Sequence, residues 1–233
     1  MVQLYLLIAI FPIYLIGLYI YNKDKEKEPI SFLFKLLFAG LLSAITVIFF
    51  STLIYLFGFA IDTINMSTYD ILIYSFLHVA SVEEGAKLLY LYLFAYKSKY
   101  YDYTFDMIVY GVFVSLGFAL FENIIYIFNY GMKVGLQRAV TAIIIHACCG
   151  VMMGLFLGKA KVKELNNNQI SYAYKIFSFL IPVCIHGMYD FCAFTGSLEN
   201  LIIVLIIVLA TCIVFVNYNS SIDKKLIDSV ESN

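Results

Sequence analysis

Two adjacent carboxylates and an ammonium lie inside a strongly apolar stretch of this chain, in the run Val82-Glu83-Glu84-Gly85-Ala86-Lys87. Each charge at the centre of a bilayer costs at least about 2.5 kcal/mol, so charged residues at that depth are usually functional. Further ionisable groups lie in other apolar stretches: Glu122, His146, His186 and Asp190. Groups of these types can serve as a catalytic site, a transport path or a cofactor pocket.

The composition places these groups in a membrane protein. Of the 233 residues, 63% are hydrophobic and 13% are charged, and the mean hydropathy is +0.90, whereas a soluble domain is closer to half apolar and a quarter charged. Seven apolar stretches have the length of about 20 residues that is needed to cross the hydrocarbon core: 3–21, 32–57, 70–96, 105–128, 139–158, 173–194 and 198–218. We expect an all-α polytopic membrane bundle of about seven transmembrane helices.

The loop cations predict how the bundle is oriented. Only Lys133 and Arg138 lie on one side of the predicted membrane. Twelve cations lie on the other side: Lys23, Lys25, Lys27, Lys35, Lys97, Lys99, Lys159, Lys161, Lys163, Lys175, Lys224 and Lys225. The positive-inside rule therefore predicts that the N-terminus is outside and the C-terminus inside. We expect one transmembrane domain over residues 1–218, followed by a short, polar and disordered cytoplasmic tail over residues 219–233.

The depth of the ionisable groups in their spans predicts that they meet. At a rise of 1.5 Å per residue, Glu83 lies about 20 Å from the outer end of its span, and Glu122 about 24 Å from the inner end of its own. In a core about 30 Å thick, the two carboxylates can meet between the middle and the outer leaflet. His146 and His186 lie at comparable depths, so we expect a shared cavity that opens outward.

Spacing within each helix predicts local pairs. Residues four apart share a helix face, so Glu83 can pair with Lys87, and Asp190 can orient the imidazole of His186. Neighbouring helical residues point about 100° apart, so Glu83 and Glu84 cannot both face one point. Which of the two is the catalytic base stays open at this stage.

Charge alone leaves several functions open. A proton-coupled transporter fits these residues at least as well as an enzyme, and a non-catalytic membrane scaffold is a third class. His78, which belongs to no spaced pair, is expected to be a hydrogen-bond partner between helices. The chain has no HExxH, no GxGD after a Tyr-Asp pair and no GxSG, which argues against metallo-, aspartyl and serine intramembrane proteases of those kinds. Zinc stays an alternative, because Glu, His and Asp are zinc ligands.

Four motifs in order resemble the PrsW family of glutamic-type intramembrane proteases. They are EExxK at Glu83–Lys87, FxxxEN at Phe118–Asn123, a third region at Arg138–Gly154 and HxxxD at His186–Asp190. Any one motif is weak, but four in this order over about residues 78–194 are specific. The wider superfamily, which includes CAAX prenyl endopeptidases and bacteriocin-processing proteins, more often has EExxxR and a His where Glu122 stands.

The resemblance implies an endopeptidase of the bacterial cytoplasmic membrane. Such an enzyme cleaves a single-pass membrane protein on the outer side, as in site-1 cleavage of an anti-sigma factor during a stress response. Its partners are that substrate and the lipid bilayer, with no nucleic acid, and no cofactor is expected. The resemblance implies catalytic roles for Glu83, Glu84, Glu122, His146, His186 and Asp190, and supporting roles for Lys87, Phe118, Asn123 and Arg138. Glu83 with Glu122 would activate water, and His186, oriented by Asp190, would bind the oxyanion.

Overall fold

The computed structural model describes residues 2–57 and 65–231 of the chain. These residues form the helices α1 (Val2–Lys23), α2 (Ile30–Leu56), α3 (Thr68–Ile73), the π-helix η1 (Tyr74–Ala80), α4 (Ser81–Phe94), α5 (Asp106–Tyr130), α6 (Met132–Val140), α7 (Ala142–Leu165), α8 (Ser171–Phe194), α9 (Leu198–Ser221) and α10 (Leu226–Glu231). The only strand-like pairing within them is an isolated bridge between Tyr103 and Lys225. The all-α prediction is confirmed.

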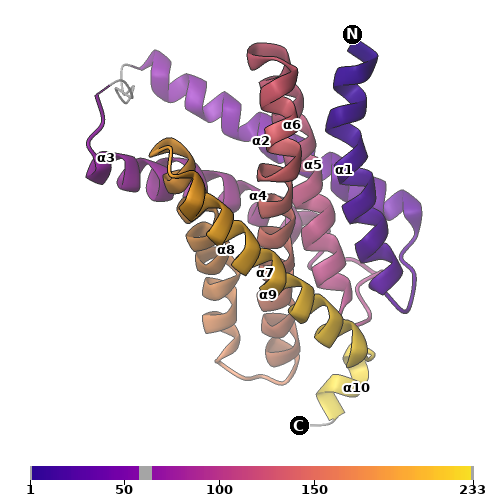
Figure 1. Ribbon diagram of the computed structural model, residues 1–233. Coiled ribbons are helices and arrows are strands. Elements are labelled where there is room, and N and C mark those ends of the chain that lie inside the picture. The colour runs from indigo at the N-terminus through magenta and orange to yellow at the C-terminus, as the bar shows by residue number, and fades with distance from the viewer. Residues whose placement is uncertain (1, 58–64, 232–233) are drawn as a thin grey trace.

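The helices form a membrane bundle. Six are long and apolar enough to cross a bilayer, judged by length and composition: α1, α2, α5, α6 with α7, α8 and α9. The remaining expected span, residues 70–96, is built from α3, η1 and α4, which follow one another without a break. Figure 1 shows this run and α2 crossing the upright helices α5 and α7. The exact number of seven spans and their orientation stay predictions.

The centre of the bundle is made by α5 and α7. Of the apolar windows, 72% of α5 and 78% of the α6–α7 stretch are buried, compared with 11% of α9. Glycines let these helices approach closely, as is common between membrane helices. A Cβ atom added at Gly40 of α2 would lie 1.9 Å from the carbonyl oxygen of Val114 in α5, and one added at Gly154 of α7 would lie 2.1 Å from that of Met107.

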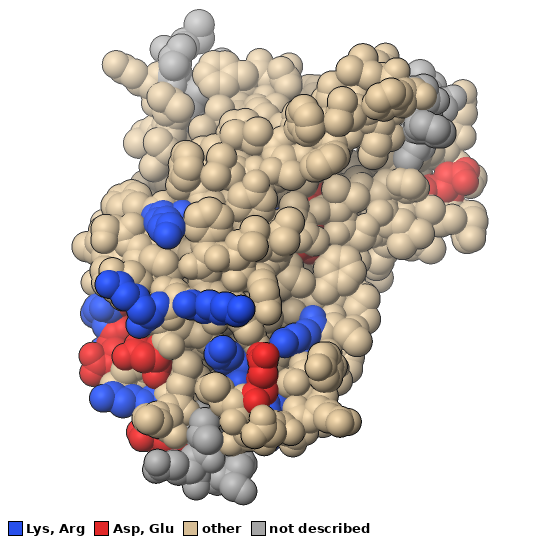
Figure 2. Space-filling view, turned by 180° about the vertical axis from the view of Figure 1, so that it is seen from behind, with Lys and Arg blue, Asp and Glu red and all other residues tan. Residues whose placement is uncertain are grey.

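Cationic side chains gather at one end of the molecule, as Figure 2 shows. The loops between α1 and α2, between α4 and α5 and between α7 and α8 reach this end, together with the C-terminal segment (Figure 1). The segregation of loop lysines that the sequence predicts is therefore also a segregation in space. We call this region the lysine-rich end.

The C-terminal segment differs from the expected disordered tail. Helix α9 continues to Ser221, and α10 follows it. Leu226 is buried, and its backbone N–H donates to the carbonyl of Asp102 at 2.8 Å. The prediction of disorder is wrong up to Glu231, because this one apolar side chain and the backbone pairing with the α4–α5 connection hold a polar segment against the bundle.

Candidate active site

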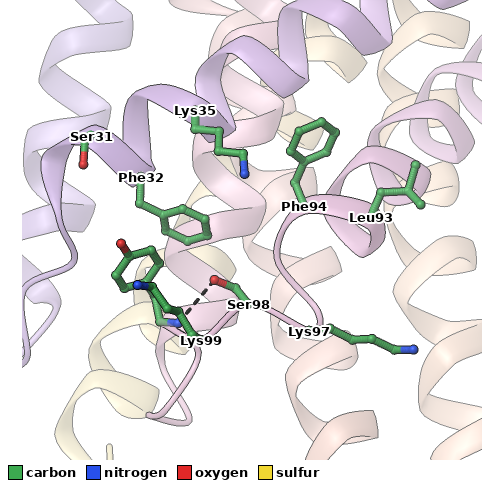
Figure 3. Close-up of a pocket in the computed structure, with 9 residues that line it drawn as sticks. Ser31, Phe32, Lys35, Leu93, Phe94, Lys97, Ser98 and Lys99 are labelled. Atoms are coloured by element: carbon green, nitrogen blue, oxygen red, sulfur yellow. Dashed lines mark hydrogen bonds between the residues drawn. The ribbon is translucent and has the colours of Figure 1, made fainter.

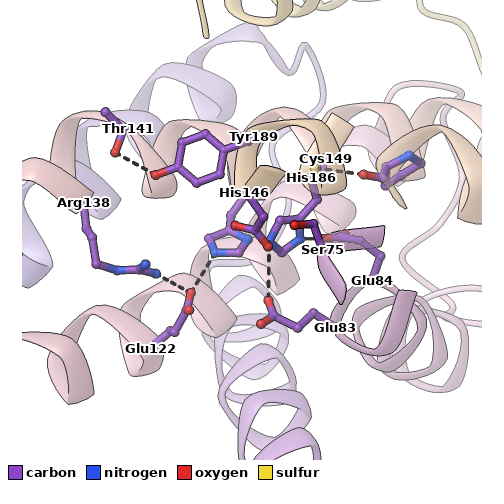
Figure 4. A network of polar contacts seen from close by, with 12 residues as sticks. Ser75, Glu83, Glu84, Glu122, Arg138, Thr141, His146, Cys149, His186 and Tyr189 are labelled. Carbon is purple, nitrogen blue, oxygen red and sulfur yellow. Dashed lines mark hydrogen bonds and ion pairs between the residues drawn. The ribbon is translucent and has the colours of Figure 1, made fainter. Parts of the chain in front are cut away.

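Five helices bring the expected ionisable residues together in one network (Figure 4). The first turn of α4 carries both adjacent carboxylates, directly after the π-helical turn η1. Turns of this kind are frequent at functional sites. Helix α4 also carries Lys87, and α5, α6, α7 and α8 supply the other members, so that the network contains Glu83, Glu84, Lys87, Glu122, Arg138, His146, His186 and Asp190.

Lys87 and Glu84 form the buried centre of the network. The Lys87 ammonium lies 2.7 Å from Glu84 Oε1 and 3.9 Å from Glu83 Oε2, and the side chains of Lys87 and Glu84 are both fully buried. The ammonium also lies 4.2 Å from the centre of the Phe118 ring. The sequence predicted Glu83 as the partner of Lys87, but the shorter contact is to Glu84 because residues three apart also share a helix face.

His186 is held from both sides by carboxylates. Its Nδ1 lies 2.8 Å from Glu84 Oε1, and its Nε2 lies 3.3 Å from Asp190 Oδ2 and 3.8 Å from Glu83 Oε2. Because an ionised carboxylate only accepts hydrogen bonds, Nδ1 donates to Glu84. The expected contact with Asp190 is therefore present, but Glu84 makes the shorter contact with the ring.

Glu122 is fixed by two short contacts. Its Oε2 lies 2.6 Å from Arg138 Nη2 and 2.8 Å from His146 Nε2. His146 Nδ1 lies 2.8 Å from the Lys87 ammonium, which only donates, so Nδ1 accepts and Nε2 carries the proton given to Glu122. Both nitrogens of His146 are therefore occupied. Its ring meets that of His186 edge-on at 5.0 Å between centroids.

A cavity of about 650 Å³ opens beside this network. Glu83, Glu122, His146, His186 and Asp190 line it. Further lining residues come from the α6–α7 junction and the α8–α9 turn, which lie away from the lysine-rich end (Figure 1). The sequence-predicted convergence of these groups on one cavity agrees with this arrangement.

Glu83 and Asp190 each bring to the wall of this cavity a carboxylate with one oxygen that has no hydrogen-bond partner among the described residues. This oxygen is Oε2 in Glu83 and Oδ2 in Asp190, and both atoms are buried. The Glu83 side chain is 12% exposed, whereas that of Glu84 is fully buried. The structure therefore gives the two adjacent glutamates different environments: Glu83 faces the cavity, and Glu84 faces Lys87 and His186.

Three of the four residues that were expected to support the site belong to the network or contact it: Lys87, Phe118 and Arg138. The fourth is Asn123. Asn123 is fully buried, but its amide has no hydrogen-bond partner in the described part of the chain. Asn123 follows Glu122 in the sequence, but its side chain makes no hydrogen bond to the described residues of the site.

The structure adds residues that sequence reasoning missed. Tyr126, one turn after Glu122, lies under Arg138 with 3.7 Å between the guanidinium carbon and the ring centre. The Tyr189 hydroxyl lies 2.9 Å from the hydroxyl of Thr141 and joins α8 to α7. The spacing of four residues could have identified Tyr126, whereas the Tyr189 contact joins helices distant in sequence and left no local signal.

His78 lies elsewhere than expected. The sequence assigned it to hydrogen bonding between helices, but its side chain is exposed and stacks on Tyr74 at 6.1 Å. It lines the cavity. The π-helical turn contains His78 and rotates the residues after it relative to their positions in a regular helix. The sequence pattern does not indicate this rotation.

Three of these residues could hold a metal ion. Donor atoms of Glu83, His146 and His186 all lie within 4.8 Å of one another. Two histidines and a glutamate are a known ligand set of catalytic zinc. The unpartnered Glu83 oxygen suits a ligand, and His146 would exchange one of its two hydrogen bonds for the metal. The residues therefore fit a zinc ion.

A second cavity lies at the lysine-rich end and has different chemistry. It measures about 400 Å³, and Lys35, Lys97 and Lys99 are among its lining residues. Figure 3 shows them around Phe32 and Phe94, with the backbone N–H of Tyr100 donating to Ser98. None of the described residues that line this cavity carries a carboxylate or an imidazole, the groups that would activate water.

Comparisons with known proteins identify a family of intramembrane proteases. Residues 28–216 match a family model described as PrsW family intramembrane metalloprotease. The chain is 36% identical over 192 residues to Protease PrsW of Clostridioides difficile (strain 630), covering 79% of this chain and 77% of the relative. It is 31% identical over 174 residues to Protease PrsW of Bacillus subtilis (strain 168), covering 74% and 75%. No solved structure matches the chain.

Proposed function

The chain belongs to the PrsW family and is a multi-pass bacterial membrane peptidase, and from this premise we propose that Glu83 activates the water that cleaves a membrane-anchored protein. The observation that carries the proposal is that Glu83 lines the cavity, while its Oε2, 3.8 Å from His186 Nε2, has no hydrogen-bond partner among the described residues. Membership of a protease family decides against the transporter and the scaffold that charge alone left open.

The residues around Glu83 supply the remaining parts of peptide hydrolysis. Glu83 takes a proton from water and passes it to the leaving amine, as a general base and then a general acid. His186 acts as an imidazolium with a proton on each ring nitrogen: Nδ1 donates to Glu84, and Nε2 donates to the oxyanion of the tetrahedral intermediate. Asp190 holds the same imidazole from the cavity side. The three carboxylates in these roles each lie less than 4.0 Å from a ring nitrogen of His186, at 3.8, 2.8 and 3.3 Å.

Glu122 has a positioning role in this proposal. Its contacts with Arg138 and His146 fix it at the wall of the cavity. Because His146 also accepts from Lys87, these contacts connect α5, α6 and α7 to α4. The sequence treated Glu83 and Glu122 as equal partners in holding water, whereas their different contacts favour Glu83 as the base.

A metal-dependent form of the reaction is a second candidate. The family description as a metalloprotease and the fit of Glu83, His146 and His186 favour it. These three residues would hold the ion, and zinc in such a site supplies a Lewis acid that acidifies water and polarises a carbonyl. Glu83 would then be a ligand instead of the base.

The substrate class follows from the place of the site. The cavity lies between helices and also has apolar walls, including Val47 of α2 and Leu201 of α9. This suits an unwound segment of a single-pass membrane protein, cut near the outer side. The resemblance of the motifs supports an anti-sigma factor as that protein.

Cleavage of a single-pass membrane substrate by the purified chain in liposomes tests the proposal. Glu83→Gln should lower the rate by about 10²–10⁴-fold, the usual loss of a general base. Glu199→Gln is the matched control, because Glu199 is exposed at the start of α9. Full activity of Glu83→Gln would refute the role of Glu83.

Metal analysis of the same preparation separates the two candidates. In the proposed mechanism, cleavage continues after treatment with a chelator. Stoichiometric zinc that is lost together with activity, and restores activity when added back, would overturn the metal-free mechanism and establish the second candidate.

A further inference from the structure

A second group of carboxylates lies at the lysine-rich end, away from the active site. Glu28 precedes α2, Asp102 lies in the α4–α5 connection, and Asp106 is the first residue of α5. One oxygen of each lies within 4.8 Å of those of the other two. Glu28 and Asp106 are buried, and Asp102 is exposed, so the group is reachable from solvent.

The group contains buried oxygen atoms that lack partners. Asp106 is fully buried, and its Oδ2 accepts from the backbone N–H groups of Asp102 at 3.0 Å and Tyr103 at 2.7 Å. Its Oδ1 has no hydrogen-bond partner among the residues that the structure describes. A buried polar atom without a partner is destabilising, so this oxygen is available to a ligand that the cluster binds.

A fourth carboxylate adds to this concentration of negative charge. Asp24, the first residue of the α1–α2 connection, is 2% exposed, and both of its carboxylate oxygens lack hydrogen-bond partners within the described part of the chain. The charge of Asp24 acts on both Glu28 and Asp106. Asp24 therefore acts on the same group from the α1 side.

Nearby cations do not neutralise the three clustered carboxylates. Over residues 2–57 and 65–231, no Lys or Arg forms an ion pair with Glu28, Asp102 or Asp106. The ammonium of Lys27 donates to backbone carbonyls. The Tyr110 hydroxyl donates to Glu28, which satisfies one oxygen without removing charge. A bound cation or bound protons must offset the remaining charge.

We propose that Glu28, Asp102 and Asp106 bind a hard divalent cation of the Mg²⁺ or Ca²⁺ class. Oxygen-only ligand sets select such cations over zinc or copper. Calcium–oxygen distances are about 2.3–2.6 Å, so two ligands on opposite sides of one ion lie about 5 Å apart. Donor oxygens that are all within 4.8 Å of one another satisfy this limit without rearrangement of the backbone.

The bound cation fastens separate parts of the chain together. It joins the connection before α2 to the first turn of α5, beside the bridge between Tyr103 and Lys225 that holds the C-terminal segment. Glu122 lies sixteen residues further along α5 than Asp106, or about 24 Å. The cation therefore stabilises the bundle and takes no part in the chemistry at the active site.

Thermal unfolding of the full chain in detergent tests this site. After treatment with EDTA, Mg²⁺ and Ca²⁺ are added separately, and Tm is followed as each is titrated. At a hundredfold excess over Kd, one of the two cations should raise Tm by roughly 5–10 °C. Glu28→Gln should abolish this rise, whereas the exposed Glu199→Gln should keep it.

The variants also give a result in the absence of metal. Glu28→Gln removes one of several repelling carboxylates, so without metal it should be at least as stable as the original chain. If Glu28→Gln does not fold, Asp102→Asn serves in its place, because Asp102 is exposed and its replacement leaves the buried groups intact. Loss of the cation response in Asp102→Asn supports the site equally.

Three results would overturn the proposal. No rise in Tm with either cation would mean that bound protons neutralise the carboxylates. An unchanged rise in Glu28→Gln would place the cation elsewhere. A rise that is lost in Glu83→Gln but kept in Glu28→Gln would assign the cation to the active site. None of these results bears on cleavage by the active site, which is measured separately.

Discussion

Replacing Lys87 with methionine tests the buried centre of the active site. The Lys87 ammonium is fully buried between Glu84 Oε1 at 2.7 Å and His146 Nδ1 at 2.8 Å. Methionine has a similar length and fills the same space without the charge. The change leaves Glu84 as a buried carboxylate that has lost its ammonium partner, so the main effect should be on stability.

The size of the effect follows from burial. Removing one partner of a buried ion pair costs about 3–5 kcal/mol, because the other charge stays buried without compensation. The pair between Lys175 and Glu164 is 3.3 Å apart, with side chains 28% and 44% exposed, and such surface pairs contribute about 0–1 kcal/mol. Lys175→Met is therefore the matched control for Lys87→Met.

The assay is unfolding of the purified variants in mixed micelles, with the free energy of unfolding taken from the transition. Lys87→Met should lose several times more stability than Lys175→Met. Adding Glu84→Gln to Lys87→Met removes the stranded charge, and the two changes should show a coupling energy of about 0.5–3 kcal/mol. Equal losses for Lys87→Met and Lys175→Met would refute the description of a desolvated ion pair.

Three further predictions concern packing, orientation and chemistry. Gly154→Ala should prevent normal folding, because the added carbon would lie 2.1 Å from a backbone carbonyl oxygen of α5. Gly17→Ala is the control and should be tolerated, because the nearest atom would lie at 3.6 Å. The measurement is the yield of folded protein for each variant. A reporter fused after Val230 should be active only in the cytoplasm, and its export would reverse the predicted orientation. In the cleavage assay, His186→Ala should cost about 10²–10³-fold, as for an oxyanion donor. Asp190→Asn should cost less, because Glu84 still holds the imidazole, and an equal or larger loss would give Asp190 a direct role.

The amino-acid sequence determined the structural class of this protein and identified which residues are candidates for its site. Hydrophobic content and the lengths of apolar runs depend only on composition and order, and they identified a helical membrane bundle. The rarity of charge in such runs selected Glu83, Glu122 and His186 as functional candidates. The contact between His186 and Asp190 was also predictable, since residues four apart on a helix are neighbours whatever surrounds them.

Only the tertiary structure determined the direction in which each of these side chains faces and the residues that it contacts. Glu83 faces the cavity and Glu84 faces Lys87, because the rotation of α4 about its axis depends on its packing and on the π-helical turn before it. His78 entered the cavity wall for the same reason.

Spacing rules along a helix do not predict contacts between segments that are distant in the sequence. Arg138 binds Glu122 from another helix, and Glu28 meets Asp106 across two connections. Local helix geometry fixes relations over about four residues. Relations between helices depend on how closely the backbones approach, which glycines such as Gly40 and Gly154 set in the folded bundle.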